Sequence, residues 1–222
     1  MPGHEKFRDR NEAGRRLAED LREYAGRDDI VVLALPRGGV PVGYEVARRL
    51  GAPLDVFLVR KLGVPGHEEL AMGAIASGGI RVINEDVTAR LRIPDEDIAR
   101  VAADEQNEIE RQERAYRGNR PEPQLEGKTA ILVDDGVATG SSMRAAAAAL
   151  RARDPDSVVV AVPVAAAETC DSFRDQVDEV VCSITPEPFR AVSLWYEDFT
   201  QVGDGEVRDI LDRAWRGEWG EI

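Results

Sequence analysis

The chain has 222 residues, of which 43% are hydrophobic and 5% aromatic, and its formal net charge is −13 at pH 7. This length suits a single α/β domain with an aliphatic core, and the negative charge argues against a nucleic-acid or anionic-membrane surface. No apolar run reaches a membrane span, and the N-terminus lacks the pattern of a signal peptide. We therefore expect a cytoplasmic protein in which Cys170 and Cys182 form neither a disulfide nor a metal pair.

Apolar periodicity predicts strands that alternate with helices. Such alternation indicates a doubly wound parallel sheet with right-handed crossovers, in which continuous apolar strands are buried. In chain order, we expect a helix at 7–24, strand 30–35, helix 40–50, strands 54–59, 72–77 and 80–84, helices 86–91 and 95–116, strand 128–133, helix 142–153, strand 158–164, helix 168–176 and strand 179–184.

Three further features of this order are less regular. Residues 60–70 are polar and contain Pro65, which predicts a long loop. Gly78-Gly79 predicts a hairpin between its two flanking strands. The helix at 95–116 has a thin apolar stripe and a broad charged face, so we expect it to lie on the surface.

Three groups of polar residues follow predicted strands, and ligands of such sheets bind beyond the carboxyl ends of the strands. The groups are Pro36-Arg37-Gly38-Gly39, Arg60-Lys61 and Asp134-Asp135. We therefore expect all three to meet at one edge of the sheet.

The segment Ala130 to Ser142 has the composition of a site for a ligand that carries both a phosphate and vicinal hydroxyls. The helix that follows the acid pair offers unpaired N–H groups and partial positive charge to an anion. Gly140 permits close backbone approach, and Thr139, Ser141 and Ser142 add hydroxyl groups. The two carboxylates suit sugar hydroxyls or a hydrated magnesium ion. An ordinary Asp-Asp-Gly turn would explain the turn but not the Thr-Gly-Ser-Ser that opens the helix.

The same segment resembles the 5-phosphoribosyl-1-pyrophosphate (PRPP) motif of type I phosphoribosyltransferases. That motif is an apolar strand, two acids, two or three mostly apolar residues and Thr-Gly-x-Thr/Ser. Gly136 stands where a bulky aliphatic residue is common, which should loosen the loop, and Ala138 replaces a frequent hydroxyl donor. The matching residues are Asp134, Asp135, Thr139, Gly140 and Ser142.

From 7 to 211 the chain also resembles a bacterial and archaeal group described only as phosphoribosyltransferase-like. The resemblance rests on Phe-Arg-Asp-Arg-x-x-Ala-Gly from Phe7, on Leu-Pro-Arg-Gly-Gly, and on Trp-Tyr-x-x-Phe. It implies the type I phosphoribosyltransferase fold as one domain over 1–222. Its parts would be a core at about 28–184, an N-terminal helix at 7–25, a long inserted helix at 95–117 and a small C-terminal hood at 185–211.

The resemblance also assigns roles. Arg37 and Lys61 would neutralise the leaving pyrophosphate, and Asp134 and Asp135 would hold the ribose; these four are the expected catalytic residues. A mobile loop after Lys61 would close the site, and His67 would either donate to the leaving group or simply be exposed there. No direct metal ligand is expected: Mg²⁺ would arrive with PRPP, and Asp134 and Asp135 are the candidates for a contact with it. The remaining PRPP-binding residues would be Gly38, Gly39, Arg60, Gly136, Val137, Ala138, Thr139, Gly140, Ser141 and Ser142.

The implied reaction transfers phosphoribosyl from PRPP to a nitrogenous base, with a purine of the salvage pathway as first candidate, and releases pyrophosphate. Trp195, Tyr196 and Phe199 either stack this base or merely cap the sheet. We expect a homodimer whose partners are PRPP and a small base, without nucleic acid or membrane. The alternative is a non-catalytic, PRPP- or nucleotide-binding regulator of the same fold.

Overall fold

The computed structural model describes residues 6–220 and 222. Residues 1–5, on which the expectation of no signal peptide partly rests, lie outside them. Among the described residues, no helix is both long and apolar enough to cross a bilayer.

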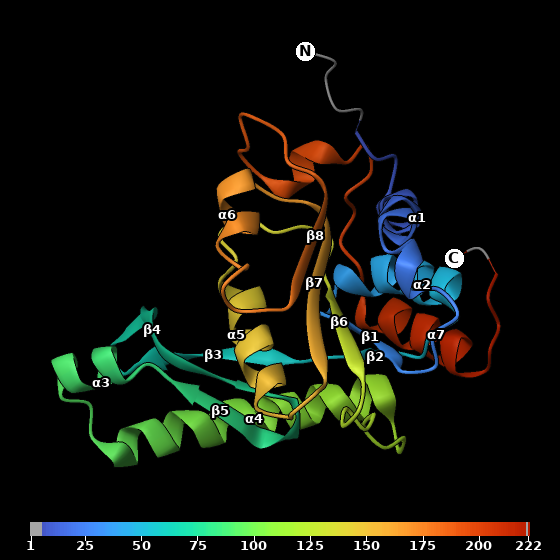
Figure 1. Ribbon diagram of the computed structural model, residues 1–222. Helices are drawn as coiled ribbons and strands as arrows, with labels where there is room; N and C mark the ends of the chain where they lie inside the picture. Colours follow the sequence, from blue (N-terminus) through green and yellow to red (C-terminus); the bar gives the residue numbers. More distant parts are fainter. Residues whose placement is uncertain (1–5, 221) are drawn as a thin grey trace.

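A five-stranded parallel sheet forms the centre of the fold, with strand order β2-β1-β6-β7-β8 (Figure 1). The sheet confirms the predicted doubly wound architecture, since the chain moves outward from β1 in both directions. In register, Ala34 at the end of β1 pairs with Val133 at the end of β6. The loops that follow these two strands are therefore neighbours. The strands are β1 (Ile30–Ala34), β2 (Leu54–Val56), β6 (Thr129–Val133), β7 (Ser157–Val164) and β8 (Glu179–Ile184).

Helices cover both faces of this sheet because the strands are apolar on both faces. Val32 points into the cluster formed with α1 (Arg10–Asp20), α2 (Gly39–Leu50) and α7 (Asp204–Trp215), whereas its neighbour Leu33 points into the cluster with α5 (Ser141–Arg151) and α6 (Ala167–Asp171). Short 3₁₀ turns lie at Arg22–Tyr24, Ser77–Gly79 and Val192–Trp195.

The prediction of a long loop at 60–70 is wrong, because this stretch belongs to an antiparallel sheet of order β3-β4-β5. Leu62 of β3 and Met72 of β4 are both fully buried, and a two-residue turn with Gly66 at φ 77° joins the strands. The many polar residues of this stretch concealed the alternation of buried and exposed side chains that is typical of a strand. The strand predicted at 54–59 is correspondingly divided between β2 and β3. The strands are β3 (Val59–Val64), β4 (His67–Ala76) and β5 (Ile80–Ile83).

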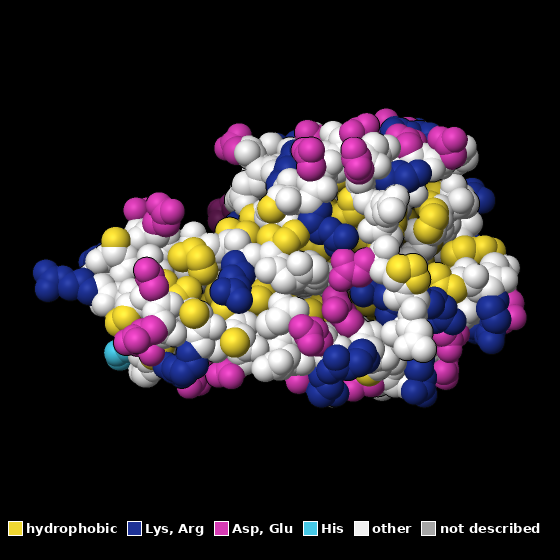
Figure 2. All heavy atoms as spheres, turned by 90° about the horizontal axis from the view of Figure 1, so that it is seen from below, with side chains coloured by type: hydrophobic (Ala, Val, Ile, Leu, Met, Phe, Trp, Pro, Cys, Tyr) yellow, Lys and Arg dark blue, Asp and Glu magenta, His cyan; other side chains and the backbone are white. Residues whose placement is uncertain are grey.

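The three strands, α3 (Glu85–Leu91) and α4 (Asp95–Arg117) form an arm that projects from the core (Figure 1). Seen from below, the arm shows hydrophobic side chains between charged ones of both signs (Figure 2). The far end of α4 does more than lie on the surface, since Ile109 and Tyr116 are buried. Arg117 is also buried there, with its Nε 3.1 Å from Oδ2 of Asp55 on β2. Burial raises the pKa of Asp55, and the guanidinium opposes that rise.

The C-terminal region also differs from expectation. Residues 204–211, predicted as part of the hood, belong to α7, which packs on α2, α4 and β2. We keep the name hood for 185–203. The helix predicted at 168–176 ends at Asp171.

The expectation of two separate thiols is wrong, because Cys170 and Cys182 are joined by a disulfide. Cys170 lies on α6, and the chain turns back after this short helix to form β8, which carries Cys182. The two side chains thus become neighbours in space, which their number and spacing alone did not indicate.

We predict that Arg117→Met will lower the free energy of unfolding by about 3–5 kcal/mol, because it leaves Asp55 as an uncompensated buried charge. Chemical denaturation measures this loss. Arg114→Met is the matched control on the same helix and should cost less than about 1 kcal/mol, since the side chains of Arg114 and its partner Glu110 are 70% and 45% exposed. Equal losses in the two variants would contradict the assignment.

Candidate functional site

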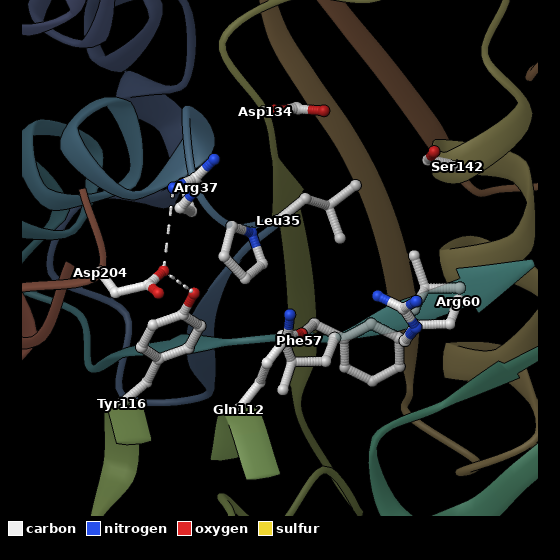
Figure 3. A pocket seen from close by; sticks show the side chains of 12 residues that line it. Leu35, Arg37, Phe57, Arg60, Gln112, Tyr116, Asp134, Ser142 and Asp204 are labelled. Carbon is white, nitrogen blue, oxygen red and sulfur yellow. Dashed lines mark hydrogen bonds and ion pairs between the residues drawn. The ribbon is translucent and has the colours of Figure 1, made fainter. Parts of the chain in front are cut away.

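A cavity of about 450 Å³ lies at the carboxyl ends of the central strands (Figure 3). It is bounded by the loop after β1, by the loop after β6, by the start of β3 and by the helices α4 and α7. The sheet edge that the sequence indicated is thus one wall, and the two helices form another. The lining residues are Leu35, Pro36, Arg37, Phe57, Leu58, Val59, Arg60, Gln112, Tyr116, Asp134, Ser142 and Asp204.

The loop after β1 lies directly against the loop after β6. A Cβ atom on Gly38 would stand 2.0 Å from Oδ2 of Asp135, and one on Gly39 would stand 2.7 Å from the carbonyl oxygen of Val133. Only glycine permits these approaches. The peptide bond between Pro36 and Arg37 is cis.

The two acids face different surroundings. Asp134 lines the cavity and points into it, whereas Asp135 is not part of the lining (Figure 3). Oδ2 of Asp135 instead accepts a hydrogen bond of 2.8 Å from Nε of Arg10, the first residue of α1. The backbone N–H of Asp135 donates to Oδ1 of Asp134 at 2.8 Å. The hydroxyl of Tyr196 donates to the backbone carbonyl of Asp135 at 2.5 Å.

Burial raises the pKa of Asp134 well above its usual range, and the charge of Asp135 raises it further. Burial also raises the pKa of Asp135, but the Arg10 guanidinium opposes this rise. The pair therefore holds protons more tightly than free carboxyls do. A cation or a sugar hydroxyl beside Asp134 would favour its ionised form.

The loop after β6 leads into α5 with an open helix N-terminus. Gly140 has φ 77°, and within the described chain no side chain caps the helix. The first N–H groups of α5 and the exposed hydroxyls of Thr139, Ser141 and Ser142 are therefore available to an anion. A Cβ atom on Gly140 would lie 2.9 Å from both Phe173 Cζ and Arg144 Nη1.

The loop between β6 and α5 is held from outside by side chains of α6 and of α5 itself. Thr169 donates its hydroxyl to the carbonyl of Ala138 at 2.9 Å, and Arg144 donates to the carbonyl of Thr139. Gly136 does not loosen the loop as we expected, since a Cβ atom there would lie 2.5 Å from Cγ1 of Val192 in the hood. Val137 is buried and pairs with the chain after β7.

The basic residues are divided between two places. Arg37 and Arg60 line the cavity; Arg37 is 4.0 Å from Asp204, and Arg60 forms an ion pair with Glu105 of α4. Lys61 points elsewhere: it is exposed, donates to the carbonyl of Glu69 at 3.3 Å and lines a groove between the arm and α5. His67 is exposed at the tip of the hairpin.

Four polar residues in or beside the cavity were not identified from the sequence. Gln112 and Tyr116 reach the cavity from α4 and Asp204 reaches it from α7, with the Tyr116 hydroxyl 2.7 Å from Oδ1 of Asp204 (Figure 3). Burial and this carboxylate raise the pKa of Tyr116. Arg10 is the fourth, and the Phe-Arg-Asp-Arg opening was a signal that could have indicated it.

The hood aromatics pack against one another and against Phe7 and Arg10 of the N-terminal segment. Tyr196 is only 3% exposed, with its ring centroid 5.5 Å from that of Phe7. The guanidinium of Arg10 lies 4.0 Å from the ring centroid of Phe199, and Trp195 is partly buried in the same cluster. The capping interpretation thus accounts for Tyr196, while Trp195 and Phe199 keep some exposed surface.

The donor set fits a magnesium ion that a ligand brings with it. Over residues 6–220 and 222, no three His, Cys, Asp or Glu side chains are grouped as a metal cage. Mg²⁺ is typically held by one or two carboxylates together with substrate phosphates, and Asp134 is a carboxylate on the cavity wall.

Comparison with known proteins agrees with this geometry. Residues 6–194 match the family model of the phosphoribosyl transferase domain. The chain belongs to this family. Rv0571c of Mycobacterium tuberculosis (strain H37Rv) carries the name of a phosphoribosyl transferase, assigned by inference. It is 46% identical to this chain over 210 residues, which cover 95% of this chain and 47% of that protein. The corresponding protein of strain CDC 1551 has the same identity and coverage.

The chain therefore spans about half the length of these curated relatives. The crystal structure of TT1426 from Thermus thermophilus is similar over nearly its whole length. Its TM-score is 0.83 at 45% identity, and the match covers 93% of this chain and 97% of that one.

We predict that Asp134→Asn will stabilise the folded chain at neutral pH. The pKa of Asp134 is raised in the folded chain, so the folded state binds the proton of this carboxyl more tightly than the unfolded state does. The stability that results is complete below the unfolded pKa of about 3.8 and is lost as the pH rises through the folded pKa. Asparagine carries no charge to bury. Thermal denaturation should show a gain at neutral pH that shrinks as the pH falls.

Asp175→Asn, at an exposed position, is the control and should show no such trend. A neutral-pH melting temperature for Asp134→Asn below that of the wild type would contradict the prediction.

Proposed function

We propose that the chain is a PRPP-dependent phosphoribosyltransferase that transfers the 5-phosphoribosyl group to a nitrogenous base and releases pyrophosphate. The observation that supports this most directly is the meeting of three parts at one cavity: the open N-terminus of α5, the carboxylate of Asp134 and the Arg37-Gly38-Gly39 loop. They suit the phosphate, the ribose and the pyrophosphate of one ligand.

In this proposal the bond between the anomeric carbon and the pyrophosphate oxygen breaks, and its electron pair leaves with that oxygen. A ring nitrogen of the base forms the new bond to carbon, and its N–H proton passes to water. Arg37 and Arg60 stabilise the negative charge on the leaving group, and Asp134 faces the positive charge on the ribose. Bound Mg²⁺ would supply further neutralisation of the pyrophosphate.

We place the base, with a purine as first candidate, beside the hood, where Trp195 and Phe199 would be available to stack it. Lys61 would turn toward the pyrophosphate when the arm approaches the core. A cytoplasmic homodimer in purine salvage remains the expected setting.

A second candidate is a non-catalytic PRPP- or nucleotide-binding regulator. One observation favours it: two of the expected functional side chains face partners within the chain, Asp135 with Arg10 and Arg37 with Asp204. A regulator would bind PRPP without releasing pyrophosphate in the presence of any base.

Both candidates are tested by one screen. The chain is incubated with PRPP, Mg²⁺ and each of hypoxanthine, guanine, xanthine, adenine, uracil and orotate, and pyrophosphate release is measured. Calorimetry with PRPP alone runs in parallel. Release with one base supports the enzyme, PRPP binding without release supports the regulator, and the absence of PRPP binding contradicts both.

With the base that gives pyrophosphate release in this screen, we predict that Arg37→Ala will lower the rate of release by about 10²–10³, since one donor to the developing negative charge is lost. Product affinity should fall far less. Arg90→Ala, at an exposed position on α3, is the control and should match the wild type. An unchanged rate in Arg37→Ala would show that the loop only shapes the turn.

A further inference from the structure

The pair of Arg10 and Asp135 joins three parts of the chain at the edge of the cavity. Arg10 begins α1, Asp135 follows β6, and the hood lies against both. We propose that Arg10 is a positioning residue that holds Asp135 away from the cavity and leaves Asp134 as the carboxylate presented to the ligand. This inference rests on the proposed function, because it concerns how the same site receives PRPP.

The guanidinium of Arg10 is fixed on several sides. Its Nε donates to Oδ2 of Asp135 at 2.8 Å, and its Nη1 donates to the carbonyl of Thr200 at 2.8 Å. Its Cζ lies over the ring of Phe199, 4.0 Å from the ring centroid. The side chains of Arg10 and Asp135 are 11% and 14% exposed, so water competes little for either partner. Arginine suits this place because it can donate in several directions while it stacks on a ring.

Asp135 is confined as tightly as its partner. Its Oδ2 lies so close to Gly38 that a Cβ atom there would be 2.0 Å away, and its carbonyl accepts the hydroxyl of Tyr196. To turn toward the cavity, this carboxylate would have to leave Arg10 and pass the loop after β1. The backbone N–H of Asp135 in turn holds Oδ1 of Asp134. Arg10 therefore acts on the carboxylate in the cavity through its neighbour.

The arrangement also sets the charge that an anionic ligand meets. Two adjacent carboxylates without a cation would repel the phosphate groups of PRPP. Arg10 compensates the charge of Asp135, which leaves one uncompensated carboxylate, Asp134, on the cavity wall. Removal of Arg10 should weaken PRPP binding although Arg10 is not among the residues that line the cavity.

Calorimetry with PRPP and Mg²⁺ tests the inference in four variants of the full chain: Arg10→Met, Arg10→Lys, Asp135→Asn and the double variant Arg10→Met/Asp135→Asn. Arg10→Met should weaken PRPP binding by roughly 10–100-fold, by analogy with residues that orient metal ligands. Arg10→Lys keeps the charge and should recover most of the affinity. The double variant should bind PRPP better than Arg10→Met, because the uncompensated charge is gone.

Arg15→Met is the matched control, since Arg15 lies on the same helix and also pairs with a buried carboxylate, Glu45, away from the cavity. It should bind PRPP like the wild type. Circular dichroism checks that each variant folds; if Arg10→Met does not, Arg10→Lys and the double variant decide.

Three results would overturn the inference. One is wild-type affinity in Arg10→Met. Another is a double variant that binds no better than the weaker single variant, which would make Asp135 itself a ligand of the ribose. The third is failure of Arg10→Lys to recover affinity while it remains folded. Absence of PRPP binding by the wild type would instead refute the proposed function together with this inference.

Discussion

The site depends on the parallel pairing of β1 with β6, which sets two loops side by side at the switch point of the sheet. Hydrogen bonding fixes the two strands in register up to Ala34 and Val133, so the residues that follow meet without freedom to separate. Gly38 and Gly39 are the means by which the loops come this close. One loop supplies backbone and an arginine, and the other supplies carboxylates and a helix N-terminus. Neither loop has this chemistry alone.

The order of strands and the residues at their ends could be predicted from the sequence because both are local signals. Continuous apolar runs such as 30–35 and 158–164 identify buried strands, and the Asp134 to Ser142 segment carries its chemistry within nine residues. The strands of the arm were harder to predict from the sequence. In β3 the inward residues Leu62 and Val64 are separated by only one residue, and Arg60 and Lys61 made the segment read as a loop.

The wall formed by α4 and α7 could not be predicted for a different reason. Tyr116 and Asp204 are 88 residues apart, and each helix taken alone shows only an amphipathic pattern. Their meeting depends on where the arm folds back, which the buried Arg117 and Asp55 fix at the edge strand β2. The disulfide is similar, since two cysteines in a sequence do not reveal that α6 is short enough to bring them together.

Gly136 and Val192 occupy complementary volumes, and this has a consequence for the family as a whole. A Cβ atom at 136 would lie 2.5 Å from Cγ1 of Val192 in the hood and 2.9 Å from Cγ1 of Val164 on β7, so residues of both the hood and the sheet limit the size of the residue at this position. A bulky aliphatic residue at the loop position should therefore accompany smaller or displaced residues both in the hood and on β7 in other members. Such paired changes would allow hoods of different shape to be combined with the same order of strands and loops.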